Sequence, residues 1–152
     1  MTISVSVLTN PQIEALHPQI AAIYRDAFVL PPYQKPEAEI ENFAQTLLRQ
    51  LDREDFRFVG AFAGSPERIV GFAYGYTSTA GQWWYEAVRP ALPKLIASQW
   101  LENSFQFVEI AVAPRVQGQG IGTLLHDHLL CGMRHGRAIL STLQASTVAH
   151  HL

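Results

Sequence analysis

The chain has 152 residues, of which 48% are hydrophobic and 16% are charged, and its formal net charge at pH 7 is −2. This length fits one domain with an apolar core. The composition argues against nucleic acid as a partner, because basic runs are missing. It also argues against a membrane span, because every apolar stretch is far shorter than the roughly 18 residues that a transmembrane helix needs. The single cysteine, Cys131, excludes an intramolecular disulfide and a cysteine-based metal cluster.

The N-terminal third of the chain predicts one strand and two helices. Residues 2–8 alternate apolar and polar side chains, as a half-buried strand does and a signal peptide does not, so we expect a cytoplasmic protein. Asn10 and Pro11 favour the start of a helix with Asn10 as its cap, and the proline pair before Tyr33 ends it. A second helix is expected over residues 37–52, with an apolar side formed by Ile40, Phe43, Ala44, Leu47, Leu48 and Leu51.

The remaining residues predict a hairpin, an insert, a strand, a helix and a last strand. Two segments rich in aromatic and β-branched residues, 56–62 and 69–77, flank a Gly/Pro turn and indicate an antiparallel hairpin. A partly helical insert follows them. Further strands are expected at 105–112 and 138–143, on either side of a helix at 120–134 whose inward side is Ile121, Leu124, Leu125 and Leu129. Because repeats and linkers are missing, we expect a single domain over residues 1–152.

The segment from Glu109 to Gly122 places a Gly-rich turn between a strand and a helix. The first backbone N–H groups of a helix have no partner inside the helix, and the helix dipole favours an anion beside them. Glycines let the backbone adopt unusual dihedral angles and let a phosphate approach without a Cβ in the way. The segment therefore predicts a phosphate or pyrophosphate site. The alternative is that the glycines only make a tight turn.

Two common phosphate loops do not fit this segment. A Walker A loop needs a lysine after its last glycine, whereas Thr123 follows Gly122 here. A dinucleotide G-x-G-x-x-G loop would have Thr123 or Leu125 at its third glycine. The pattern Q/R-x-x-G-x-G does fit, through Gln117, Gly120 and Gly122. Together with the strand before it and the leucine pair after it, this pattern resembles the acyl-CoA pyrophosphate motif of the GNAT superfamily of N-acyltransferases.

The resemblance implies a mixed α/β (α+β) fold in which helices flank a mostly antiparallel sheet. It implies an N-acetyltransferase that moves an acetyl group from acetyl-CoA to a primary amine of a small molecule or peptide. The alternative is a catalytically degenerate GNAT-like domain that binds CoA or a partner chain without turnover. The pantetheine arm would lie between residues 108–112 and 139–143. The expected cofactor-binding residues are Ile110, Ala111, Val112, Gln117, Gly118, Gln119, Gly120, Ile121, Gly122 and Thr123.

Candidate catalytic and acceptor residues follow from the same resemblance. The attacking amine must be neutral, so a base or a water relay is required. Glu109 is the candidate general base because of its position on the strand at the cleft; otherwise it simply faces solvent or binds a neighbouring backbone group. The acceptor is expected near Tyr33, Trp83 and Trp84, unless these aromatic residues belong to the core or to an interface. We expect no metal site, because the histidines show no ligand spacing.

The end of the chain departs from the family pattern. Residues 141–152 resemble a strand and the start of a helix that in relatives continues to a tyrosine beside the leaving thiol and then to further strands. We therefore expect a shortened C-terminus that lacks this last helix, the closing strands and the usual general acid. Three explanations stay open: an inactive shortened chain, a second subunit that supplies the missing parts, or another acid such as Tyr85 or a water. Because a strand edge would otherwise face water, we expect a homodimer.

Overall fold

A computed structural model of the protein describes residues 2–141. One five-stranded sheet runs through these residues in the order β1-β2-β3-β4-β5. All neighbouring strands are antiparallel except β4 and β5, which are parallel. The predicted mostly antiparallel sheet and its β2–β3 hairpin are therefore confirmed. The strands are β1 (Ile3–Val7), β2 (Arg57–Ala63), β3 (Arg68–Thr77), β4 (Ser104–Val112) and β5 (Arg137–Ile139).

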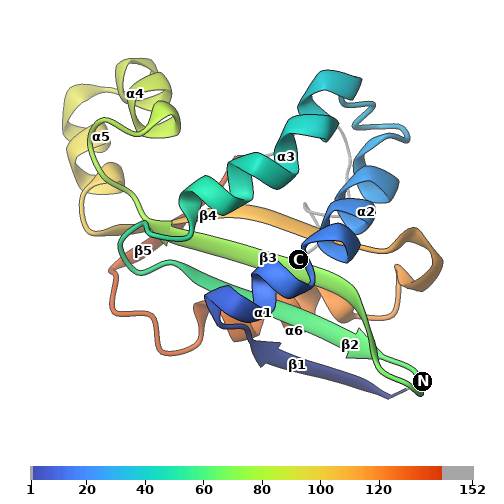
Figure 1. Cartoon of the computed structure of the whole chain (residues 1–152). Helices are drawn as coiled ribbons and strands as arrows, with labels where there is room; N and C mark the ends of the chain where they lie inside the picture. Colours follow the sequence, from blue (N-terminus) through green and yellow to red (C-terminus); the bar gives the residue numbers. More distant parts are fainter. Residues whose placement is uncertain (1, 142–152) are drawn as a thin grey trace.

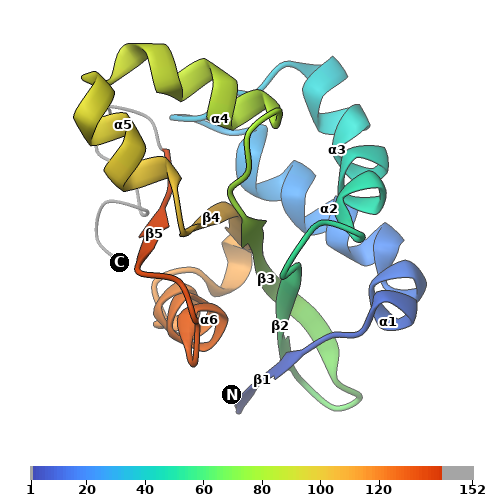
Figure 2. The same cartoon turned by 90° about the vertical axis from the view of Figure 1, so that its left-hand side faces the viewer.

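Helices cover both faces of the sheet (Figures 1 and 2). One face carries three helices from the N-terminal part of the chain, and the other face carries α6 (Ile121–Leu130). The three helices are α1 (Asn10–Ala15), α2 (His17–Phe28) and α3 (Glu37–Gln50). The predicted insert between β3 and β4 stands beyond one end of the sheet and is largely helical. It consists of α4 (Trp83–Val88), the 3₁₀ helix η1 (Arg89–Ala91) and α5 (Lys94–Leu101).

Two apolar clusters fix the helices to the sheet. Along β3, Phe72, Tyr74 and Tyr76 belong to the cluster beneath α2 and α3, whereas Val70 and Ala73 belong to the cluster beneath α6. The Tyr74 and Phe72 side chains are almost fully buried. The cluster beneath α2 and α3 is rich in aromatic rings, and it forms the surroundings of Glu109 described below.

The start of α1 differs from the predicted one. Thr9, and not Asn10, is the cap: its hydroxyl accepts a hydrogen bond from the Gln12 backbone N–H at 3.3 Å, and the Gln12 side chain accepts one from the Thr9 N–H at 2.8 Å. This reciprocal capping box satisfies two N–H groups that a single cap would leave free. The predicted first helix is also divided in two, because a new helix begins at His17 with a proline in its first turn.

Helix α6 ends at Leu130, four residues before the predicted end. Gly132 adopts a φ of 72°, a left-handed conformation that stops an α-helix, and Cys131 before it is already extended, with its side chain exposed. β5 begins shortly afterwards at Arg137 and ends at Ile139. The last part of the predicted strand 138–143 lies outside the described residues.

Two apolar residues predicted to face inward, Leu48 and Leu124, are exposed instead, and so is Val7 in the strand predicted at residues 2–8. Val7, Leu48 and Leu124 are exposed to 52%, 38% and 40%. On α6 the buried row is Ile121, Leu125 and Leu129, which repeats every four residues and is narrower than the predicted apolar side. Leu124 lies beside this row, and Leu48 lies in the same way beside the buried row of α3. Val7 is the last residue of an edge strand, where only one neighbouring strand covers it.

Candidate active site

The Gly-rich turn leads from η2 (Pro114–Val116) into α6, and it is built on two left-handed glycines. Gly118 and Gly120 have φ angles of 78° and 80°, and a Cβ added at either position would meet no atom within 4 Å. Lack of space is therefore not what requires glycine here; the backbone conformation requires it. Gly120 occupies the cap position of α6, and no side chain caps the helix.

Backbone donors converge at this turn. Among the described residues, the N–H groups of residues 118–120 have no hydrogen-bond acceptor, and those of Ile121, Gly122 and Thr123 belong to the first helical turn, where an intrahelical acceptor is missing. The turn is also exposed to solvent from Gln117 to Gly120. Consecutive free N–H groups at the positive end of a helix favour an anion such as a phosphate. The geometry thus fits the phosphate site that the sequence predicts.

The Gln117 side chain ties the turn to the end of β4. Its Nε2 donates a hydrogen bond to the backbone carbonyl of Val112 at 2.9 Å. The side-chain amide of Gln117 is therefore engaged within the protein, and its backbone N–H donates to the Pro114 carbonyl at 3.3 Å, so the free donors of the turn begin at Gly118. The sequence indicates that a glutamine belongs at this position, but the contact with Val112 is visible only in the folded chain.

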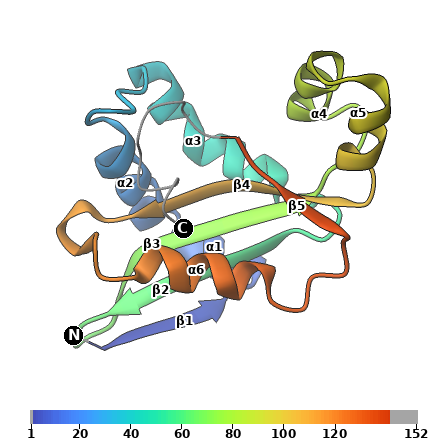
Figure 3. The ribbon, with the colours of Figure 1, turned by 180° about the vertical axis from the view of Figure 1, so that it is seen from behind.

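Among residues 2–141, the far edge of β4 is unpaired along most of its length. β5 pairs with β4 only at Ser104–Gln106, and Figure 3 shows β5 leaving β4 at an angle. The Ala113 N–H donates to the Val70 carbonyl on β3, so alternation along an antiparallel pair directs the polar groups of Ile110 and Val112 away from β3. Within the described part of the chain, no strand pairs with this stretch. An extended ligand with amide groups can add to it as a strand would.

Glu109 lies on the opposite side of the same strand segment, facing the helices. It stands directly across from Tyr74, so its side chain lies on the face of the sheet that α2 and α3 cover. The β3–β4 register shifts beside this pair, where Val108 is an extra residue on β4. The bulge brings Glu109 onto the aromatic side, where its carboxylate accepts no hydrogen bond from any described residue.

Burial raises the pKa of the Glu109 carboxyl to about 7, although the Lys35 ammonium group lowers it. Lys35 belongs to the loop between α2 and α3, and its Nζ lies 2.8 Å from Tyr24 Oη and 3.6 Å from Glu39 Oε1. Burial would lower the pKa of Lys35, but the negative charge of Glu109 and the Tyr24 contact raise it above its ordinary value. Lys35 thus stays charged, and Glu109 changes its charge near neutral pH.

The predicted acceptor residues are not gathered in one place. Tyr33 follows α2 and packs edge to face on Phe28, with ring centroids 4.8 Å apart. Trp83 and Trp84 lie in α4, at the other end of the sheet in Figures 1 and 3. The Trp83 side chain is 81% exposed, and Trp84 Nε1 donates to Ser141 Oγ at 3.1 Å. Tyr33 and the tryptophans therefore cannot contact one small acceptor together.

Histidine and acidic side chains in residues 2–141 form no group of three or more arranged for a metal ion. On α6, His126 contacts Asp127 at 3.0 Å, and His128 contacts the Leu124 carbonyl at 2.8 Å. In the same part of the chain, each helix is too short or too polar to cross a bilayer.

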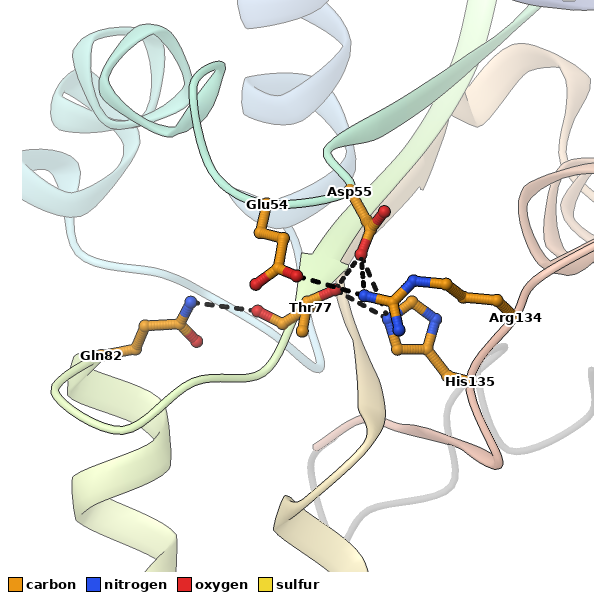
Figure 4. Close-up of polar contacts among 6 residues, drawn as sticks. All are labelled: Glu54, Asp55, Thr77, Gln82, Arg134 and His135. Carbon is orange, nitrogen blue, oxygen red and sulfur yellow. Dashed lines mark hydrogen bonds and ion pairs between the residues drawn. The ribbon is translucent and has the colours of Figure 1, made fainter.

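A second polar cluster lies at the base of β5 and was not predicted from the sequence (Figure 4). The cluster is centred on one carboxylate oxygen of Asp55, which is approached by Thr77, Arg134 and His135. The four residues come from three separate segments of the chain. These residues are far apart in the sequence and share no motif, so only the folded chain brings them together.

The chain belongs to the GNAT acetyltransferase family, because the profile of the "Acetyltransferase (GNAT) family" matches residues 17–152. The GCN5-like protein acetyltransferase Rv2170 of Mycobacterium tuberculosis (strain ATCC 25618 / H37Rv) is 35% identical over 79 residues. That match covers 49% of this chain and 38% of the relative, so the chain spans well under half the length of that protein.

Solved structures share the fold. The aminoglycoside acetyltransferase HMB0005 from an uncultured soil metagenomic sample has a TM-score of 0.62 at 16% identity, over 95% of this chain and 82% of the other. The PaiA N-acetyltransferase from Thermoplasma acidophilum in complex with coenzyme A has a TM-score of 0.54 at 19% identity, over 84% of this chain and 69% of the other. At these identities the likeness extends to the architecture alone.

Proposed function

We propose that the protein is an acetyl-CoA-dependent N-acetyltransferase that acts on a primary amine of a small molecule or peptide. One observation carries the proposal: the open edge of β4 leads to the free N–H groups of residues 118–123, while the same strand holds Glu109. Family membership supports the reaction type, and the CoA complex of the PaiA enzyme supports the donor. Neighbours named for aminoglycosides and for ribosomal-protein alanine support amine acceptors.

Each part of this arrangement has a chemical task. The N–H groups of the turn hold the pyrophosphate. The polar backbone groups of Ile110 and the N–H of Val112 pair with the pantetheine amides, while the Val112 carbonyl accepts from Gln117. These contacts position the thioester carbonyl for attack. The Glu109 carboxylate takes a proton from the acceptor ammonium or, through a water, from the attacking nitrogen. The new N–C bond forms as the C–S bond breaks, and the departing thiolate then takes up a proton.

Glu109 suits the role of base because its pKa lies close to neutral pH. A carboxylate with an ordinary pKa near 4 would be too weak a base for an amine, whereas a group that titrates near the working pH can both accept and release a proton. Burial in the aromatic layer provides this shift, and the nearby Lys35 limits it. A domain that only binds CoA does not require a carboxyl group with a raised pKa at this position.

Calorimetry with acetyl-CoA and thiol release with a panel of amines test the proposal together. The Gly120→Glu variant places a carboxylate in the anion site, and we expect it to lose measurable binding. Gly132→Glu is a matched control, because Gly132 has a similar φ and equally open surroundings at the other end of α6. Equal affinities of Gly120→Glu and wild type would contradict the pyrophosphate site, and binding without turnover on any amine would favour a CoA-binding module.

Several expectations from the sequence stay predictions. These are the single domain over residues 1–152, the homodimer and the cytoplasmic location. The departure from the family pattern after Ser141 falls on residues 142–152, outside the described residues. Sedimentation at micromolar concentration tests the homodimer, and a monomer would contradict it.

A further inference from the structure

The cluster at the base of β5 is centred on Asp55, which precedes β2. Its Oδ2 accepts hydrogen bonds from the Thr77 hydroxyl at 2.6 Å and from Arg134 Nη2 at 2.5 Å, and it lies 3.6 Å from His135 Nε2. The same Thr77 oxygen lies 2.7 Å from His135 Nε2. Figure 4 shows these side chains meeting between the end of β3 and the loop that follows α6.

Burial identifies the part of the cluster that matters most. The side chain of His135 is 2% exposed, and Thr77 is buried as well, whereas Arg134 is more than half exposed. Exposed ion pairs contribute little because water screens them, while hydrogen bonds among buried groups are costly to lose. Because the Thr77 hydroxyl donates its proton to Asp55, His135 Nε2 must donate to the Thr77 oxygen. Asp55 therefore holds His135 through Thr77.

The cluster holds the chain just where β5 begins. Arg134 and His135 lie immediately before β5, and the Gly136 N–H donates to the carbonyl of Asn103, the residue before β4, at 3.2 Å. β5 then pairs with β4 at only three positions before the two strands separate. The start of β5 is thus fixed by Asp55 and Thr77, whereas its end has no further pairing among the described residues.

We propose that Asp55 is a positioning residue that, through Thr77, Arg134 and His135, fixes the start of β5 and thereby the opening between β4 and β5 that admits the pantetheine arm. This inference rests on the proposed function. Asp55 touches neither the turn at Gly120 nor Glu109, so it acts on acyl-CoA only through the placement of β5.

The Asp55→Gly variant tests this inference cleanly. Asp55 has a φ of 56°, which glycine adopts without strain, so the substitution removes the carboxylate and leaves the backbone conformation accessible. We expect the Kd for CoA to rise about tenfold or more, with faster amide hydrogen exchange in residues 137–139 and an acceptor KM close to that of wild type. The Asp55→Asn variant keeps the shape and loses the charge, and it provides a folded intermediate if Asp55→Gly does not fold.

A matched control separates positioning from a general loss of stability. Thr9→Ala removes the cap of α1, far from β5, and lowers the melting temperature without touching the cluster. An unchanged CoA affinity in the Asp55 variants would overturn the inference, and so would an equal loss of affinity in Thr9→Ala. If wild type itself fails to bind CoA, the proposed function fails, and that result is distinct from a wild type that binds CoA as its Asp55 variants do.

Discussion

Glu109 in β4 and Asp55 in the turn before β2 are two carboxylates whose surroundings give them opposite properties. Glu109 is half-buried beside aromatic rings and accepts no hydrogen bond from the described residues, so loss of hydration raises the pKa of its carboxyl to about 7. Asp55 is more exposed, and hydrogen bonds from Thr77 and Arg134 lower the pKa of its carboxyl. Burial without donors yields a group that exchanges protons, whereas donors keep a charge in place. The first property suits catalysis, and the second suits architecture.

The largest expected effect comes from replacing Glu109. Glu109→Gln keeps the size of the side chain but removes the base, so turnover should fall by about 10²–10⁴-fold, the usual contribution of a general base. The Kd for acetyl-CoA should stay within about twofold, since the proposed CoA site lies along the edge of β4 whereas the Glu109 side chain faces the helices. Steady-state kinetics and calorimetry check this, with the exposed Glu102→Gln as a control. Retained turnover in Glu109→Gln would show that Glu109 is not the general base.

Glu109 and Asp55 should make the free energy of unfolding of the protein depend on pH in opposite senses. The folded-state pKa of Glu109 lies above its unfolded value near 4.5, so its contribution is fully present below that value and is lost as the pH rises through about 7. The loss should amount to about 1–3 kcal/mol in the free energy of unfolding. Urea denaturation at several pH values measures it. The same loss in Glu109→Gln would show that another group is responsible.

The positive charge of Lys35 counters the effect of burial on the pKa of Glu109. Removing its charge in Lys35→Met should raise the pKa of Glu109 further, so the acid limb of the kcat/KM profile should move to higher pH and the rate at pH 7 should fall a few-fold. Lys94→Met, in the exposed part of α5, should leave the profile unchanged. A shift toward lower pH in Lys35→Met would contradict the assignment of the limb to Glu109.

The titration of Asp55 should have the smallest effect, and it should appear as a change in protein stability at acid pH. Because its folded-state pKa is lowered, the stability that it contributes is present above its unfolded pKa, near 3.8, and is lost as the pH falls below that value. Asp55→Asn should therefore flatten the decline of the melting temperature between about pH 4 and pH 2.5. An acid decline as steep as that of wild type would assign it to other carboxylates.

Local requirements made part of this molecule predictable from the sequence. The turn at Gly118–Gly120 requires a left-handed backbone and the start of a helix, and a short Gly-rich stretch of sequence indicates both. Strand alternation and the Gly/Pro turn likewise predict the β2–β3 hairpin. The cap of α1 was misplaced by one residue because Asn10 and Thr9 are both good caps, and only the reciprocal contact with Gln12 selects Thr9.

The features that depend on tertiary contacts could not be predicted in this way. Lys35 approaches Glu109 only because the loop after α2 places its ammonium group over the Tyr24 and Phe28 rings. The Asp55 cluster joins residues from three segments, and no local sequence pattern indicates that these residues contact one another. Trp83 and Tyr33 are both aromatic residues outside the predicted core, yet the fold places them at opposite ends of the sheet.

The exposed thiol after α6 has a practical use. Cys131 is the only cysteine in the sequence, and it lies three residues before Arg134 and at the opposite end of α6 from Gly120. A maleimide fluorophore or a nitroxide spin label will therefore attach at one position, without any mutation. Its signal can follow the loop before β5 in real time as coenzyme A is mixed with the labelled protein.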